Sequence, residues 1–130
     1  MKNETSKYVA DWILRANEDL KTSEILLREG AMSNTICFHA QQAVEKYLKS
    51  FLARHEKHVR KTHDLEFLLD ACIEVDNSFN ELLEEARYLD QFYIAARYPA
   101  DTPEFSMEEA KKAFAAANRI KDFVIKKISN

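Results

Sequence analysis

Residues 33–54 read SNTICFHAQQAVEKYLKSFLAR, and their apolar side chains recur every three or four positions. This period matches the turn of an α-helix that places one apolar face against a core. Ser33 or Asn34 is expected to cap this helix, because a short polar side chain there can accept a free backbone N–H. The helix is expected to end near Arg54. The residues expected in its apolar stripe are Ile36, Cys37, Ala40, Ala43, Val44, Tyr47, Leu48 and Phe51.

The helical period continues on the N-terminal side of this stretch. A helix is expected from about Ser6 to Glu29, and its apolar face begins with Val9 and Trp12. Gly30 follows directly, and glycine adopts the left-handed conformation that ends many helices at little cost. The sequence therefore predicts two helices joined by a short turn at Gly30.

Three further helical segments are expected on the C-terminal side, over about residues 63–75, from about residue 79 to Ala96, and from Ser106 onward. Ser78 with Glu81, and Ser106 with Glu109, show the spacing of a capping box, in which each side chain satisfies a free backbone N–H. Each box is expected to open the helix that follows it.

The composition argues against β architectures. The 130 residues include one glycine and two prolines, whereas a sandwich or barrel needs many turns with positive φ. Strong helix formers such as Ala, Leu, Glu and Lys are abundant instead. The expected fold class is all-α, an up-and-down bundle of about five helices that forms a single domain over residues 1–130.

The overall charge attracts neither nucleic acid nor membrane, because the formal net charge is only −3. No apolar run reaches the roughly 18 residues of a membrane span, and the N-terminus lacks the apolar core of a signal peptide. A cytoplasmic location is therefore expected. Cys37 and Cys72 lie in apolar stretches, and we expect them to be free and buried.

The polar face of the 33–54 helix carries His39, Gln42, Lys46 and Lys49 at helical spacing. In one interpretation this face is solvated, and Glu45 supports the helix through an ion pair with Lys49 four residues later. In the other, His39, Lys46 and Lys49 meet an anion such as phosphate. Of the two interpretations, the residues alone favour the solvated face.

Residues 55–63 read HEKHVRKTH and hold three histidines and three Lys or Arg residues. One interpretation is a solvated loop. A second is a phosphate or nucleic-acid contact, because Lys and Arg neutralise backbone charge. A third is a metal site that uses His55 and His58 on one helical face, but no Cys or carboxylate stands at regular ligand spacing to complete it.

The motif Arg97-Tyr98-Pro99 is expected to end the fourth helix. Arg97 either stabilises the C-terminal dipole of that helix, with Tyr98 packed beside it, or holds a phosphate with its planar guanidinium. Arg87 and Asp90 lie one turn apart and are expected to form a surface ion pair.

Several short motifs follow one another in a fixed order. They are NEDL at 17–20, FHAQQAVEKYLK at 38–49, THDL at 62–65 and RYP at 97–99. In this order and spacing, over about residues 8–125, the chain resembles the small prokaryotic members of the HEPN domain family. Gly-rich phosphate loops, nucleophile elbows and di-iron Glu-x-x-His motifs are absent from the sequence.

The resemblance implies a helical bundle like that of nucleotidyltransferase substrate-binding subunits. It also implies a homodimer, commonly encoded beside a minimal nucleotidyltransferase and in many relatives part of a toxin–antitoxin pair. Ribonucleases of the family carry an Arg followed, after four to six residues, by a His. Arg97 occupies the Arg position, but the matching window Thr102-Pro103-Glu104 holds no His. Because His is the usual base near neutral pH, this departure argues against ribonuclease activity.

Three functions follow from these patterns. The first is a homodimer that binds a nucleotide or RNA and acts with a nucleotidyltransferase partner. The second is a metal-independent ribonuclease with His63 or His39 as its base, and the third is a structural dimer. No catalytic residue, metal or cofactor is assigned. The candidate nucleotide- or phosphate-binding residues are Arg97, Tyr98, His39, Lys46, Lys49 and His63.

Overall fold

The structure, a computed structural model, describes residues 2–97 and 103–129, and the side chains of residues 4–93 and 103–129. Its elements are α1 (Lys2–Glu29), α2 (Ser33–Arg54), α3 (Leu65–Val75), the 3₁₀ helix η1 (Asn77–Leu82), α4 (Leu83–Arg97) and α5 (Met107–Ser129). The expected all-α fold with five helices is confirmed. Tyr98, a candidate binding residue, and Pro99, expected to end the fourth helix, lie outside the described residues.

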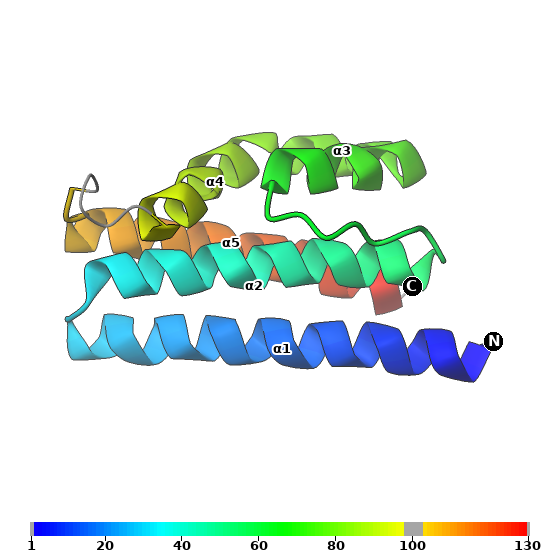
Figure 1. The fold of residues 1–130 in the computed structure, drawn as a ribbon, viewed down its shortest axis with the longest axis horizontal. Coiled ribbons are helices and arrows are strands. Elements are labelled where there is room, and N and C mark those ends of the chain that lie inside the picture. The colour runs from blue at the N-terminus through cyan, green and yellow to red at the C-terminus, as the bar shows by residue number, and fades with distance from the viewer. Residues whose placement is uncertain (1, 98–102, 130) are drawn as a thin grey trace.

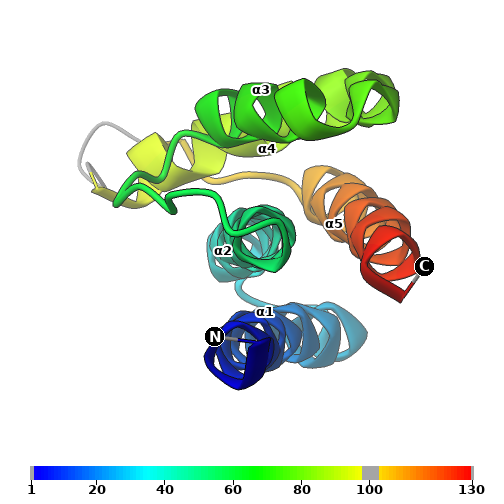
Figure 2. The ribbon, with the colours of Figure 1, turned by 90° about the vertical axis from the view of Figure 1, so that its right-hand side faces the viewer.

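Helix α2 lies at the centre of the bundle. Figure 2 shows α1 on one side of it, the layer of α3 and α4 on the opposite side, and α5 beside it, and α2 contacts all four of these helices. The small side chains of Ala40 and Ala43 are fully buried, which permits the close approach of neighbouring helices. All eight residues expected in the apolar stripe of α2 are buried.

The segment 55–64 connects the two layers. It leaves the C-terminal end of α2 and runs back along that helix, so that α3 points in the same direction as α2 (Figure 1). Helix α3 begins at Leu65, two residues later than expected, because the Asp64 carboxylate caps it by accepting the Phe67 N–H at 3.0 Å. His63 therefore stays in the connecting segment rather than in a helix.

The turn between α1 and α2 is partly as expected. Gly30 ends α1 with a φ of 69°, and its N–H donates back to the last turn of α1. The expected cap by Ser33 or Asn34 is wrong, since Met32 holds the cap position without a side-chain hydrogen bond. Ser33 Oγ instead donates to the Phe105 carbonyl at 2.5 Å, and Asn34 accepts the Phe105 N–H at 2.8 Å. Both side chains thus fasten the start of α2 to the segment before α5.

The fourth helical region is divided into η1 and α4. The expected capping box of Ser78 and Glu81 is wrong, because the Asp76 carboxylate takes the cap position and accepts the Ser78 N–H at 3.0 Å and the Ser78 hydroxyl at 2.6 Å. The box of Ser106 and Glu109 is confirmed, with both reciprocal hydrogen bonds at 3.0 Å.

Asp76 is expected to make stability depend on acid pH. The hydrogen bond from the Ser78 hydroxyl, followed by that from Lys127, lowers the pKa of Asp76 from 3.8 to about 2. A lowered carboxyl pKa contributes stability that is present above the unfolded-state pKa and is lost as pH falls from about 4 to about 2. Because the side chain is 29% exposed, solvent screening leaves a contribution of about 1 kcal/mol.

Urea unfolding of the wild type and of Asp76→Asn, measured at several pH values, checks this expectation. The variant should be less stable by about 1 kcal/mol at pH ~6, and the difference should shrink as pH approaches ~2.5. A difference that stays constant over this range would show that the charge of Asp76 contributes nothing.

The two cysteines behave as expected, since Cys37 and Cys72 are free and buried. Burial raises the pKa of the Cys37 thiol to about 12 and raises that of Cys72 as well. Both therefore remain protonated near neutral pH and act as small apolar side chains. None of the described helices combines the length and the apolar character that crossing a membrane requires.

Candidate functional site

Part of the polar face of α2 packs against α1 instead of facing solvent. Asp19 of α1 accepts a hydrogen bond from Nδ1 of His39 at 3.0 Å and forms an ion pair with Lys46. Beside it, the Tyr47 hydroxyl donates to Asn17 Oδ1 at 2.5 Å, and burial raises the pKa of that hydroxyl. These five residues, here named the Asp19 cluster, join α1 to α2.

A second group of polar side chains surrounds Glu45 on α2. The Glu45 carboxylate accepts hydrogen bonds from Lys49 Nζ at 2.8 Å, from His63 Nδ1 at 2.7 Å and from Gln42 Nε2 at 3.4 Å. The expected Glu45–Lys49 ion pair is present, but its side chains are only 4% and 6% exposed. In this Glu45 cluster (Gln42, Glu45, Lys49 and His63), the central ion pair is therefore buried rather than solvated, while His63 lies at its exposed edge.

Lys49 is also enclosed from the side of α1. Its Nζ lies 5.2 Å from the centre of the Trp12 ring, within the range of a cation–π contact. The indole N–H of Trp12 is buried and has no acceptor within the described part of the chain. Lys49 thus has a carboxylate on one side and an aromatic ring on another, which leaves it little surface for a ligand.

His63 reaches from the Glu45 cluster to α4. Its ring stacks on the Tyr93 ring, with centres 4.2 Å apart and planes 15° apart. The side chain of His63 is 47% exposed. Arg97 follows Tyr93 by four residues in α4, so the two positions share one face of that helix. His63 and Tyr93, which are 30 residues apart in sequence, thus meet where α4 passes the start of α3. Together with the position of Arg97, one turn further along α4, they are here named the α4-end site (His63, Tyr93 and Arg97).

Asp90 fixes this arrangement from the same face of α4. It accepts the Leu65 N–H at 3.0 Å, which satisfies a free donor at the start of α3. Burial raises the pKa of Asp90. The expected ion pair between Arg87 and Asp90 is wrong, because Arg87 Nε instead binds Glu66 at 3.0 Å. The side chain of Asp90 therefore holds α3 and α4 in register beside His63.

The charges decide which of the candidate residues remain open to a ligand. Lys46 and Lys49 are neutralised by Asp19 and Glu45, so an added phosphate would have to displace a carboxylate from each. His39 and His63 are bound to those same carboxylates through Nδ1, which carries the proton because a carboxylate only accepts. In the neutral form of each ring, Nε2 is then the acceptor.

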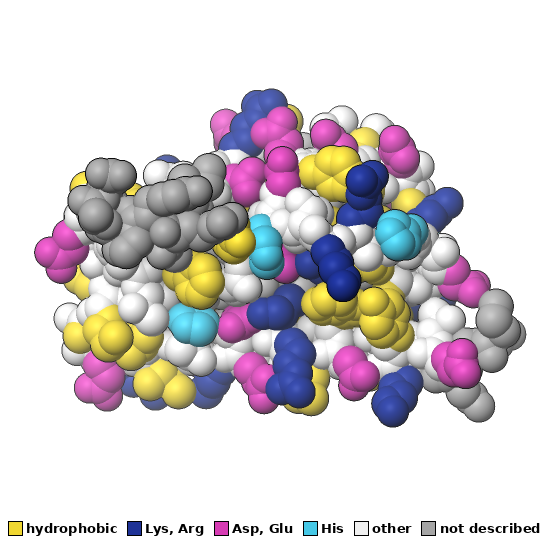
Figure 3. All heavy atoms as spheres, in the orientation of Figure 1, with side chains coloured by type: hydrophobic (Ala, Val, Ile, Leu, Met, Phe, Trp, Pro, Cys, Tyr) yellow, Lys and Arg dark blue, Asp and Glu magenta, His cyan; other side chains and the backbone are white. Residues whose placement is uncertain are grey.

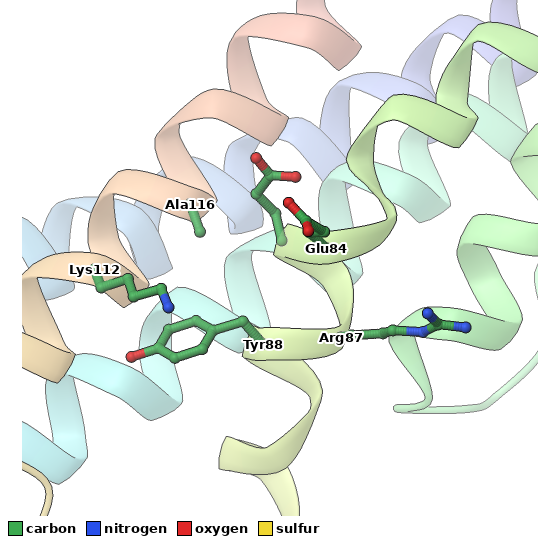
Figure 4. A pocket seen from close by; sticks show the side chains of 6 residues that line it. Glu84, Arg87, Tyr88, Lys112 and Ala116 are labelled. Atoms are coloured by element: carbon green, nitrogen blue, oxygen red, sulfur yellow. The ribbon is translucent and has the colours of Figure 1, made fainter.

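A depression of about 420 Å³ between α4 and α5 is a second place to look for a ligand. Figure 4 shows Lys112 and Tyr88 turned toward each other across it, while Arg87 points away. The Lys112 ammonium lies 4.3 Å from the centre of the Tyr88 ring, and Glu85 is paired with Arg119 at 2.6 Å. Lys112, Arg87 and Glu85 thus each interact with another side chain of the protein, and we assign the depression no ligand.

Sequence reasoning missed Asp19 and Tyr93 as members of these groups. Both lie within motifs or stripes that the sequence displays, but their partners are 20 to 30 residues away. The sequence does contain a signal for Asp19. It lies next to Leu20, three residues after Ala16 and four before Ser23, and these three residues are buried on α1.

Among the described residues, no three His, Cys, Asp or Glu side chains converge in a way that could hold a metal ion.

Known proteins resemble this chain along nearly its whole length. The model of the HEPN domain matches residues 9–128. The crystal structure of an archaeal HEPN homologue is 28% identical, with a TM-score of 0.76 over 92% of this chain and 97% of the other. A crystal structure from Thermus thermophilus is 30% identical, with the same TM-score and coverage. No curated protein matches the sequence. A family match that spans all five helices, supported by these two structures, shows that the chain belongs to the HEPN domain family.

Proposed function

We propose that this HEPN-domain protein is a homodimer that binds a nucleotide or RNA and acts with a separately encoded minimal nucleotidyltransferase, as in a toxin–antitoxin pair. The observation that supports binding most directly is the α4-end site, where a half-exposed His63 ring is stacked on Tyr93 one helical turn before Arg97. Aromatic rings stack on nucleobases, and a guanidinium binds phosphate. The partnership and the dimer are proposed from family membership.

Amide chemical shifts in ¹H–¹⁵N NMR spectra, recorded with ATP and with a short RNA, test where the ligand binds. We expect shifts in residues 62–65 and 90–97, because both segments contribute to the α4-end site. Shifts confined to the depression between α4 and α5, or no shifts at all, would contradict the proposal. Light scattering of the same samples should give twice the mass of one chain, and a single-chain mass would contradict the homodimer.

A ribonuclease is the second candidate, and one observation favours it. Glu45 holds Nδ1 of His63, which leaves Nε2 free to accept a proton, as a general base requires. The RNA recovered from the titration tests this candidate. Fragments that appear with the wild type and not with His63→Ala would support cleavage, and intact RNA would leave binding as the function.

A further inference from the structure

Four unpaired positive charges of the described chain lie close together in sequence around the segment that runs back along α2. Arg54, Lys57, Arg60 and Lys61 are all exposed, and none is within ion-pair distance of a carboxylate in the part of the chain that the structure describes. Glu56 is the one acidic residue among positions 54–63. In contrast to Lys46 and Lys49, these cations are available to an external anion.

The backbone of this segment is fixed. Glu56 closes the end of α2 with a φ of 55°, and the next N–H, that of Lys57, donates to the Leu52 carbonyl at 2.9 Å. Val59 packs against the core, and Gln41 holds the His63 carbonyl at 3.1 Å. Because these contacts order the backbone in advance, a ligand would not have to order it on binding.

Aromatic rings lie beside the C-terminal part of the segment at two positions. The Arg60 guanidinium sits 5.3 Å from the centre of the Phe67 ring, and Phe67 is 43% exposed. Three residues after Arg60, the ring of His63 is stacked on Tyr93. A row of cations with exposed rings beside it is the arrangement that binds single-stranded nucleic acid, since phosphates meet the charges and bases stack on the rings.

The segment also crosses a visible face of the molecule. Figure 3 shows Lys, Arg and His side chains spread over the face on which the segment passes α2. A depression of about 720 Å³ lies at its start, lined by His55, Lys57 and His58 with residues of α2 and α3. At its other end the segment reaches His63 of the α4-end site.

We infer that residues 54–63, together with Phe67, form a track for a single strand of RNA that leads from the C-terminal end of α2 to His63. That the track ends at His63 rests on the proposed function. The ligand of the track is RNA rather than a free nucleotide. Four cations that meet successive phosphates need a strand of several nucleotides, which a mononucleotide does not supply.

Fluorescence anisotropy with a labelled oligouridine RNA of about 12 nucleotides, from about 50 to about 200 mM salt, tests the track. Lys57→Ala/Arg60→Ala/Lys61→Ala should weaken RNA binding on the order of 100-fold near 0.1 M salt. It should also reduce the slope of log affinity against log salt by about 2, as the loss of three phosphate contacts to a single strand implies. A matched control, Arg28→Ala/Lys111→Ala/Lys126→Ala, removes the same charge from exposed positions on α1 and α5 and should change affinity by less than about 3-fold.

The outcomes separate the track from the proposed function. Equal losses in both triple variants would overturn the track, because net charge alone would then explain binding. An acidic peptide or anionic vesicles of equal charge that bind as tightly as RNA would also overturn it. If RNA affinity falls in Arg97→Ala but not in the Lys57/Arg60/Lys61 variant, the proposed function stands and the track is rejected. If RNA affinity falls in the Lys57/Arg60/Lys61 variant but not in Arg97→Ala, the track is supported and the α4-end site is rejected.

Discussion

Glu45→Ala is expected to destabilise the fold by about 3–5 kcal/mol, which is the usual cost of removing one partner from a buried ion pair. The Lys49 side chain is only 6% exposed, so its ammonium would be left without a counter-charge and with little access to water. His63 would lose its carboxylate acceptor in the same step. The connecting segment would then be held to α2 by fewer contacts.

Urea unfolding followed by circular dichroism measures this effect. Glu108→Ala is the matched control, because the side chain of Glu108 is 86% exposed and pairs with the exposed Lys111 at 3.6 Å. It should change stability by less than about 0.5 kcal/mol. Glu45→Gln keeps the size of the side chain and should fold with an intermediate loss. Losses below about 1 kcal/mol for both Glu45 variants would show that Lys49 and His63 find other partners.

The fold could be predicted from the sequence because the helical signals are long and local. The apolar stripe of α2 repeats over 22 residues, and all its members are buried as expected. Gly30 was informative for a similar reason, since its position after a periodic segment indicates a C-terminal stop. The direction of α3 was not predictable in this way, because it depends on a connecting segment without periodicity.

The two failed caps have different physical causes. Ser33 and Asn34 stand at a helix start, but their side chains bind Phe105, about 70 residues away in sequence. At Ser78, a competing carboxylate two residues earlier takes the cap position. A capping pattern indicates which local hydrogen bonds are possible, and competing partners, whether distant or local in sequence, decide which of them form.

The site was harder to predict than the fold. The i, i+4 pair of Glu45 and Lys49 could be predicted from spacing, but its burial depends on Trp12 and on the returning segment. The neutralisation of Lys46 depends on Asp19, which lies 27 residues earlier. Spacing along one helix therefore indicated which residues share a face, and only the packed structure determined which of them remain open to a ligand.

Arg97→Ala is expected to weaken nucleotide binding on the order of 10- to 100-fold, which corresponds to about 1–3 kcal/mol for lost charge-assisted hydrogen bonds to phosphate. The position of Arg97 supports this expectation, because it lies one turn after Tyr93, whose ring stacks on that of His63. Helicity should remain near that of the wild type, since Arg97 is the last residue of α4. The matched control is Arg87→Ala in the same helix, where the side chain is 60% exposed and bound to Glu66.

Calorimetric titration of ATP into the wild type, Arg97→Ala and Arg87→Ala tests the central claim, that the α4-end site binds a nucleotide phosphate. The account predicts binding by the wild type and by Arg87→Ala with similar affinity, and binding at least about 10-fold weaker by Arg97→Ala. Equal affinity of all three proteins, or no heat of binding with the wild type, would contradict the claim.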